Sequence, residues 1–108
     1  MSHSPPRVKA VGGVTTLTIT DRFLDGENLQ AVLRHLRRLA KQPGRCKLRL
    51  DLGAVKALSG GGLGQLVTLH KDLRAAGGRL TVCNVDRMVY EVFQVTRLTK
   101  LLDVRPKG

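Results

Sequence analysis

A glycine cluster in the middle of the chain is the sequence feature with the clearest potential for chemistry. Residues 58–66 read LSGGGLGQL, between an apolar run typical of a strand and one typical of a helix. Glycine-rich corners of this kind often bind phosphate, because the backbone N–H groups at a helix N-terminus point towards the ligand. The stretch could therefore bind a nucleotide, carry a phosphate on Ser59, or only turn the chain.

The spacing of these glycines does not fit the two common nucleotide-binding fingerprints. A P-loop requires a lysine and a hydroxyl residue directly after its last glycine, whereas Gln65 and Leu66 follow Gly64. A dinucleotide-binding loop requires G-x-G-x-x-G, and counting from Gly60 places Gln65 where the third glycine belongs. The start of the helix could still attract an anion, but a tight, close-packed corner is the simpler interpretation.

Residues that bind metals or catalyse reactions are scattered along the chain. The three histidines, His3, His35 and His70, lack the spacing of a metal site, and the eight acids suggest no carboxylate pair. His70 falls on the apolar side of its predicted helix, where a hydrogen-bonded core histidine is the usual outcome. We therefore expect no metal, no cofactor and no enzymatic activity.

Length and composition are typical of one small globular domain. The chain has 108 residues, and no apolar run is long enough to span a membrane. Residues 1–6 lack the apolar stretch of a signal peptide and are expected to form a flexible tail before a domain over residues 7–106. Cys46 and Cys83 lie far apart in predicted strands, which favours buried, reduced thiols in a cytoplasmic protein.

The net charge of +11, from 19 Lys+Arg against 8 Asp+Glu, favours an acidic partner. Four basic residues share one face of the first predicted helix and form a basic stripe: Arg34, Arg37, Arg38 and Lys41. With only three aromatic residues and no nucleic-acid-binding motif, sequence-specific reading of nucleic acid is not expected. A weakly binding nucleic-acid-associated domain stays open as one alternative, and a nucleotide or small-ligand sensor as another.

Hydrophobic periodicity places these features on alternating strands and helices. Strands are predicted over residues 14–20, 47–52 and 79–85, with a partner strand over 7–12 turned back at Gly12-Gly13. Helices are predicted over residues 26–42, from Leu63 to Gly77-Gly78, and after an N-cap at Asp86, and a short segment over 98–102 closes the domain. This order predicts an α/β domain with a mixed sheet of four to five strands and about four helices.

From about residue 14 to residue 104 the sequence resembles a STAS domain, the fold of bacterial anti-sigma factor antagonists. Four stretches carry the resemblance: Leu50-Asp51-Leu52 ends a strand, Gly62-Leu63-Gly64 opens a helix, residues 75–80 (AAGGRL) precede the next strand, and residues 96–102 (TRLTKLL) lie near the end. The resemblance implies a non-enzymatic protein-binding domain in bacterial signalling and transcription control. Its partner would be a kinase-type anti-sigma factor, a serine kinase that releases its sigma factor when the unmodified antagonist binds.

The resemblance also implies a phosphorylation switch, and here the sequence departs from the family. The usual motif is Asp-Ser-x-Gly-Leu-Gly, and on residues 59–64 it puts Ser59 at the Asp position and Gly60 at the phosphoacceptor position. Gly60 has no hydroxyl group, so the standard phosphorylation site is lost. Ser59 is the one nearby acceptor, although we favour a helix-capping role for its hydroxyl oxygen.

The predicted partner-binding surface is the glycine loop with the start and exposed side of the second helix. It consists of Lys56, Ser59, Gly60, Gly61, Gly62, Gln65, Lys71 and Arg74. The sequence leaves the oligomeric state open.

Overall fold

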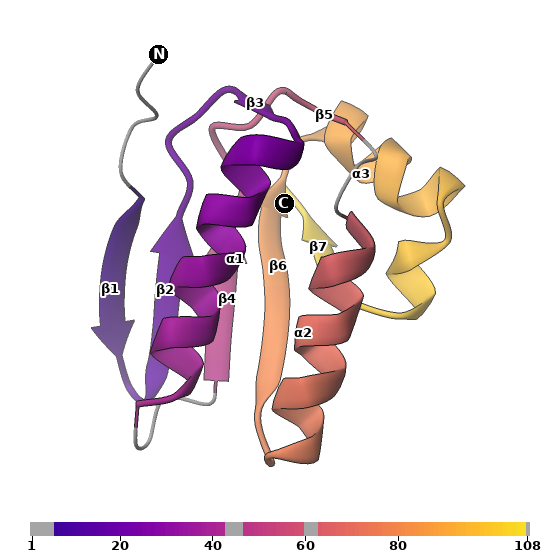
Figure 1. The fold of residues 1–108 in the computed structure, drawn as a ribbon. Helices are drawn as coiled ribbons and strands as arrows, with labels where there is room; N and C mark the ends of the chain where they lie inside the picture. Colours follow the sequence, from indigo (N-terminus) through magenta and orange to yellow (C-terminus); the bar gives the residue numbers. More distant parts are fainter. Residues whose placement is uncertain (1–5, 43–46, 60–62, 108) are drawn as a thin grey trace.

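The computed structural model describes residues 6–42, 47–59 and 63–107 (Figure 1). Its main sheet has the strand order β1-β2-β4-β6-β7, in which β1 is antiparallel to β2 and all other neighbours are parallel. These strands are β1 (Arg7–Val11), β2 (Val14–Thr18), β4 (Lys47–Asp51), β6 (Arg79–Val85) and β7 (Asp103–Pro106). The predicted mixed α/β sheet is confirmed.

The remaining elements are helices and one small strand pair. The helices are α1 (Gly26–Ala40), α2 (Leu63–Ala75), α3 (Arg87–Val95) and the 3-10 helix η1 (Leu98–Lys100), so three α-helices and one 3-10 helix stand where about four helices were predicted. Strands β3 (Phe23–Leu24) and β5 (Ala57–Leu58) pair in parallel outside the main sheet. In the described parts of the chain, the helices are too short or too polar to cross a membrane.

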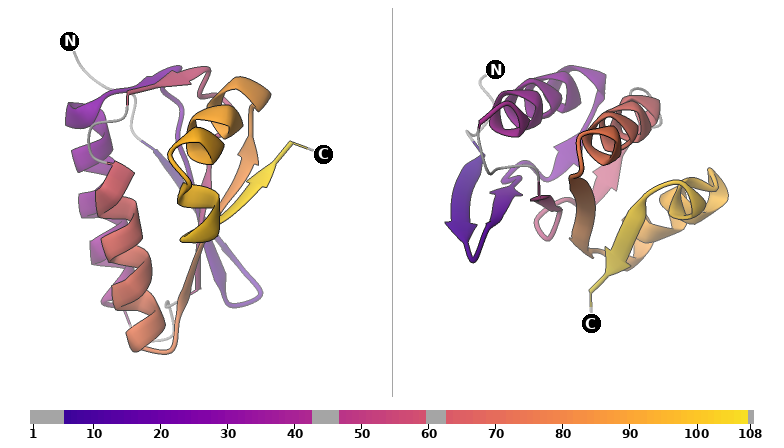
Figure 2. Two further views of the ribbon diagram at one scale, coloured as in Figure 1. Left: turned by 90° about the vertical axis from the view of Figure 1, so that its right-hand side faces the viewer. Right: turned by 90° about the horizontal axis from the view of Figure 1, so that it is seen from below.

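One face of the main sheet is covered by helices and the other is not. Helices α1 and α2 pack side by side on the covered face, and α3 lies beyond the β7 edge (Figures 1 and 2). Leu48 and Leu50 of β4 are buried against this helical layer, together with their register partners on β2 and β6. Because side chains alternate along a strand, Lys47, Arg49 and Asp51 point to the uncovered face.

Local sequence signals determine where most helices begin and end. The Asp25 carboxylate accepts a hydrogen bond from the N–H of Asn28 at 2.9 Å, and the Asn28 side chain accepts one from the N–H of Asp25 at 2.8 Å. This reciprocal capping box fixes the start of α1. Asp86 caps α3 as predicted, since its carboxylate accepts from the N–H of Met88 at 3.1 Å. Gly77, at φ +84°, provides the left-handed turn that ends α2.

Candidate functional site: the start of helix α2

The glycine loop follows the short strand β5, which the sequence did not predict. Strand β5 ends at Leu58, Ser59 follows it, and α2 begins at Leu63. The predicted site residues Gly60, Gly61 and Gly62 lie outside the described residues. The backbone N–H groups that a capping Ser59 would contact belong to the same residues, so its capping role stays a prediction. The surroundings of the loop are therefore defined by Ser59 on one side and the first turn of α2 on the other.

Backbone hydrogen bonds between β3 and β5 fix the position of the segment that enters the loop. The N–H of Lys56 donates to the carbonyl of Arg22 at 2.7 Å, and the N–H of Ser59 donates to the carbonyl of Leu24 at 2.9 Å. Leu24 is buried, and the Asn28 side chain donates to the carbonyl of Phe23 at 2.7 Å. The segment that enters the loop is thus held beside the N-terminal end of α1.

An ion pair connects the same segment to α3. Lys56 Nζ lies 3.2 Å from Asp86 Oδ2, and Asp86 is the N-cap residue of α3. The backbone N–H of Met88, with a further hydrogen bond from Lys56, lowers the pKa of the Asp86 carboxyl group. The carboxylate therefore stays ionised near neutral pH and holds the start of α3 next to Lys56.

The predicted surface residues on α2 are exposed, but they do not all lie near the loop. Leu63, Leu66, Leu69 and Leu73 form the buried side of the helix, whereas Gln65, Lys71 and Arg74 are exposed. At 1.5 Å of rise per residue, Arg74 lies about 13 Å along the helix from Gln65. Gln65 therefore lies in the first turn of α2 and Arg74 at its far end, whereas Lys56 and Ser59 lie on the segment that enters the glycine loop.

Two exposed apolar side chains next to the segment that enters the loop were not identified from the sequence. Phe23 on β3 is 49% exposed, and Met88 in the first turn of α3 is 71% exposed. Phe23 is in register with Ala57 of β5, and Met88 is hydrogen-bonded to Asp86, the partner of Lys56. The signal for Met88 was its place two residues after a predicted N-cap, before the first core position of that helix at Val89. Large apolar groups beside polar loop residues are typical of protein-binding surfaces.

The basic stripe on α1 is exposed as predicted, and one of its members has a partner. Arg37 lies 3.5 Å from Asp72 of α2, an ion pair between the two helices that the local sequence of α1 could not reveal. No ion pair involves Arg34, Arg38 or Lys41 in the parts of the chain that the structure describes. The stripe therefore remains mostly a solvated surface.

The prediction of a hydrogen-bonded core histidine at His70 is wrong. The Nδ1 atom of His70 is buried but has no hydrogen-bond partner within the described residues. Desolvation, with the nearby charges of Arg74 and Arg79, lowers the pKa of the imidazole from its ordinary value of 6.5. The imidazole is thus mostly neutral near neutral pH.

The described residues offer no group of three or more histidine, cysteine, aspartate or glutamate side chains that could hold a metal ion. Cys83 is a free, buried thiol, and desolvation raises its pKa. A thiol with a raised pKa is a poor nucleophile at neutral pH. Cys46 lies outside the described residues.

Comparison with known families identifies the fold. The STAS domain family model matches residues 5–107, and the chain therefore belongs to the STAS domain family. A crystal structure of TM1081, a candidate anti-sigma factor antagonist from Thermotoga maritima, is similar with a TM-score of 0.81 and 20% identity, over 94% of this chain and 86% of that chain.

Two further solved structures share this fold. An anti-sigma-factor antagonist (STAS) domain protein from Planctomyces limnophilus has a TM-score of 0.77 and 20% identity, over 97% of this chain and 92% of that one. The Bacillus anti-sigma factor antagonist SpoIIAA in its unphosphorylated form has a TM-score of 0.75 and 16% identity, over 92% and 86%. SpoIIAA has also been solved in a phosphorylated form.

Proposed function

We propose that this chain is an anti-sigma factor antagonist that binds a kinase-type anti-sigma factor in the bacterial cytoplasm without a phosphorylation switch at the usual position. The observation that carries the proposal is the surface around β5, where Lys56 is ion-paired with Asp86 and the apolar side chains of Phe23 and Met88 are exposed on the neighbouring β3 and α3. A mixed surface of this kind suits a protein partner better than a small substrate.

The sequence of the glycine loop supports the second half of the proposal. The position that carries the phosphoacceptor in the family motif is Gly60, which has no hydroxyl group. A phosphate at this position would add about −1.5 to −2 charges to the centre of the contact surface. Without the acceptor hydroxyl, the surface cannot gain this charge at Gly60. Binding of the anti-sigma factor would then be constitutive or regulated through the partner.

The proposal can be tested by measuring the affinity of the purified chain for the kinase-type anti-sigma factors encoded in the same genome. Gly61→Arg places a bulky charged side chain in the glycine loop and should weaken binding at least tenfold, a change of about 1.4 kcal/mol. Gln42→Arg is the matched control, because it adds the same charge at an exposed position beyond the C-terminal end of α1, whereas the segment that enters the loop lies beside the N-terminal end of α1.

Equal affinities of the two variants for the anti-sigma factor would place the interface elsewhere. Circular dichroism and thermal unfolding show whether each variant keeps the fold. Binding by none of the kinase-type anti-sigma factors would refute the proposed partner.

A further inference from the structure

The uncovered face of the main sheet carries a concentration of positive charge remote from the glycine loop. Lys47 and Arg49 lie on β4, Arg79 lies on β6 and Arg105 lies on β7, and all four are exposed. The alternation that buries Leu48 under the helices sends these basic side chains to the other face. Arg7 and Lys9 of the edge strand β1 extend the same face, because they are in register with Thr18 and Thr16 of β2.

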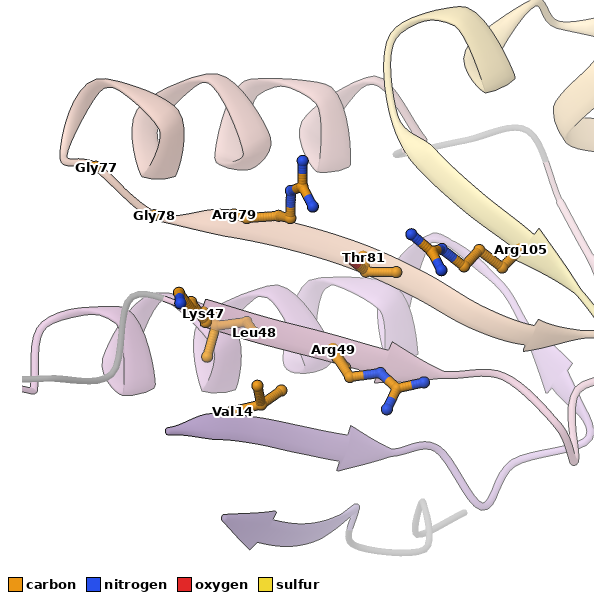
Figure 3. A pocket seen from close by; sticks show the side chains of 9 residues that line it. All are labelled: Val14, Lys47, Leu48, Arg49, Gly77, Gly78, Arg79, Thr81 and Arg105. Atoms are coloured by element: carbon orange, nitrogen blue, oxygen red, sulfur yellow. The ribbon is translucent and has the colours of Figure 1, made fainter. Parts of the chain in front are cut away.

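These four cations line a cavity of about 530 Å³. Figure 3 shows its lining side chains, which come from β2, β4, β6, β7 and the turn that follows α2. In this view the side chain of Arg105 extends from β7 towards Thr81 on β6. A volume of a few hundred Å³ is typical of small-molecule sites. We call this feature the basic cavity and define it by Lys47, Arg49, Arg79 and Arg105.

The fold places like charges next to each other in the basic cavity. Lys47 is the direct register partner of Arg79 on the adjacent parallel strand, so their backbones lie about 4.8 Å apart. Arg49 is two residues further along β4, about 6.6 Å from Lys47, on the same face. Like charges directly opposite one another destabilise a sheet. An anion bound between them would relieve this repulsion.

Among the described residues, the acids of this face form a salt bridge with Arg105 and leave the other three cations of the cavity without one. Asp103 is engaged by Arg105, whose Nε lies 3.3 Å away, and by the Thr81 hydroxyl at 3.2 Å. Burial opposes ionisation of Asp103, but these hydrogen bonds outweigh it and lower the pKa of the carboxyl group. Asp51 accepts hydrogen bonds from the N–H of Gly53 and from Asn84. Within the described residues, Lys47, Arg49 and Arg79 form no salt bridge.

We propose that the basic cavity binds a small anion that carries several phosphate charges, such as an oligophosphate or a nucleoside triphosphate. Arginine and lysine are the side chains that bind phosphate best, and two or more of them can contact adjacent phosphate groups. Nucleic acid is disfavoured, because the lining residues include no aromatic side chain on which a base could stack. The cavity volume of about 530 Å³ likewise suits a compact ligand.

The basic cavity is separate from the proposed partner surface. Lys47 and Arg79 are the first residues of their strands, whereas β5 and the start of α2 lie towards the end of the sheet to which the parallel strands run (Figure 1). Anion binding therefore does not depend on the proposed binding of an anti-sigma factor. Each function can fail without the other.

The test is isothermal titration with inorganic triphosphate as the probe. The wild-type chain should bind it with one-to-one stoichiometry, and ATP as a second probe shows whether a nucleoside adds affinity. Loss of one charge-assisted hydrogen bond costs about tenfold in affinity, so the double variant K47Q/R49Q should bind about 100-fold more weakly. The matched control R34Q/R38Q removes the same charge from the solvated face of α1 and should bind within about threefold of wild type.

Loss of affinity by the same factor in both double variants would overturn the proposal, since net charge alone would then explain binding. Absence of triphosphate and ATP binding would also overturn it. An oligouridylate that binds more tightly than triphosphate, and is not displaced by it, would show that the face is a nucleic-acid surface instead. Perturbation of the amide signals of Gly78 and Thr81 by triphosphate provides a readout that does not depend on the substitutions, and absence of any shift would count against the site.

Discussion

Truncation of Met88 is the sharpest test of the partner surface, because the exposed fraction of its side chain gives the expected loss of binding free energy. Met88 is 71% exposed, and full burial of a methionine side chain contributes about 1.5–3 kcal/mol. The buried three-tenths of the side chain therefore contributes less than about 1 kcal/mol to folding. Met88→Ala should fold normally, the more so because alanine is the best helix former.

The exposed part of Met88 sets the expected effect on binding. If the anti-sigma factor buries it, the substitution should lose about 1–2 kcal/mol of binding free energy, a factor of about 6 to 30 in affinity. The assay is titration calorimetry with the anti-sigma factor, at a temperature well below the unfolding midpoint of both variants.

Val95→Ala is the matched control, because Val95 is an exposed apolar residue at the other end of the same helix. It is 83% exposed, and its truncation should change affinity by less than about twofold. If Met88→Ala binds as tightly as wild type, or no more weakly than Val95→Ala, α3 does not contribute to the interface. The reasoning from exposed apolar groups would then be refuted.

Two further predictions concern single side chains. If Ser59 caps α2, Ser59→Ala should lower the free energy of unfolding by about 1 kcal/mol and leave anti-sigma factor binding intact. Chemical denaturation measures the change in the free energy of unfolding. A phosphate found on Ser59 by mass spectrometry of protein from growing cells would contradict the capping role. The pKa of His70 is lowered below 6.5 in the folded state, so the unfolded chain binds the proton more readily. The free energy of unfolding should therefore be highest above pH 6.5 and fall as the pH drops below that value. His70→Gln should remove this dependence, and an unchanged pH profile in denaturant titrations would show that the imidazole is not responsible.

Much of the fold follows from local patterns in the sequence. The strict alternation of KLRLDL predicts β4 and its buried leucines, and Asp86 is followed by the apolar spacing of α3. Glycine pairs mark the β1–β2 turn and the end of α2, since Gly12, Gly13 and Gly77 all have positive φ angles. These elements were predictable because each is determined by side chains within a few residues of one another.

The missed elements depend on contacts between distant parts of the chain. Strands β3 and β5 have two residues each, too few to show a period, and are held by pairing with each other across 33 residues of sequence. Strand β7 contains Pro106 and two charged residues, so its pattern alone does not indicate a strand. It forms because its apolar Val104 pairs with Val82 of β6.

The same distinction applies to the candidate sites. The glycine loop was found from its composition, but the contributions of Phe23 and Met88 required the β3–β5 pairing and the Lys56–Asp86 ion pair. The basic cavity was missed although its residues were visible, because only the pairing of β4 with β6 places Lys47 opposite Arg79. The unpaired Nδ1 of His70 likewise depends on tertiary packing.

The central claim is that this STAS domain antagonises an anti-sigma factor without being switched off by phosphorylation. The most direct measurement adds the purified chain and ATP to a preformed complex of the kinase-type anti-sigma factor and its sigma factor, and follows sigma release over time. Sigma should be released and stay released, with no phosphate incorporated into the chain. Failure to release sigma, or release that reverses as the chain becomes phosphorylated, would contradict it.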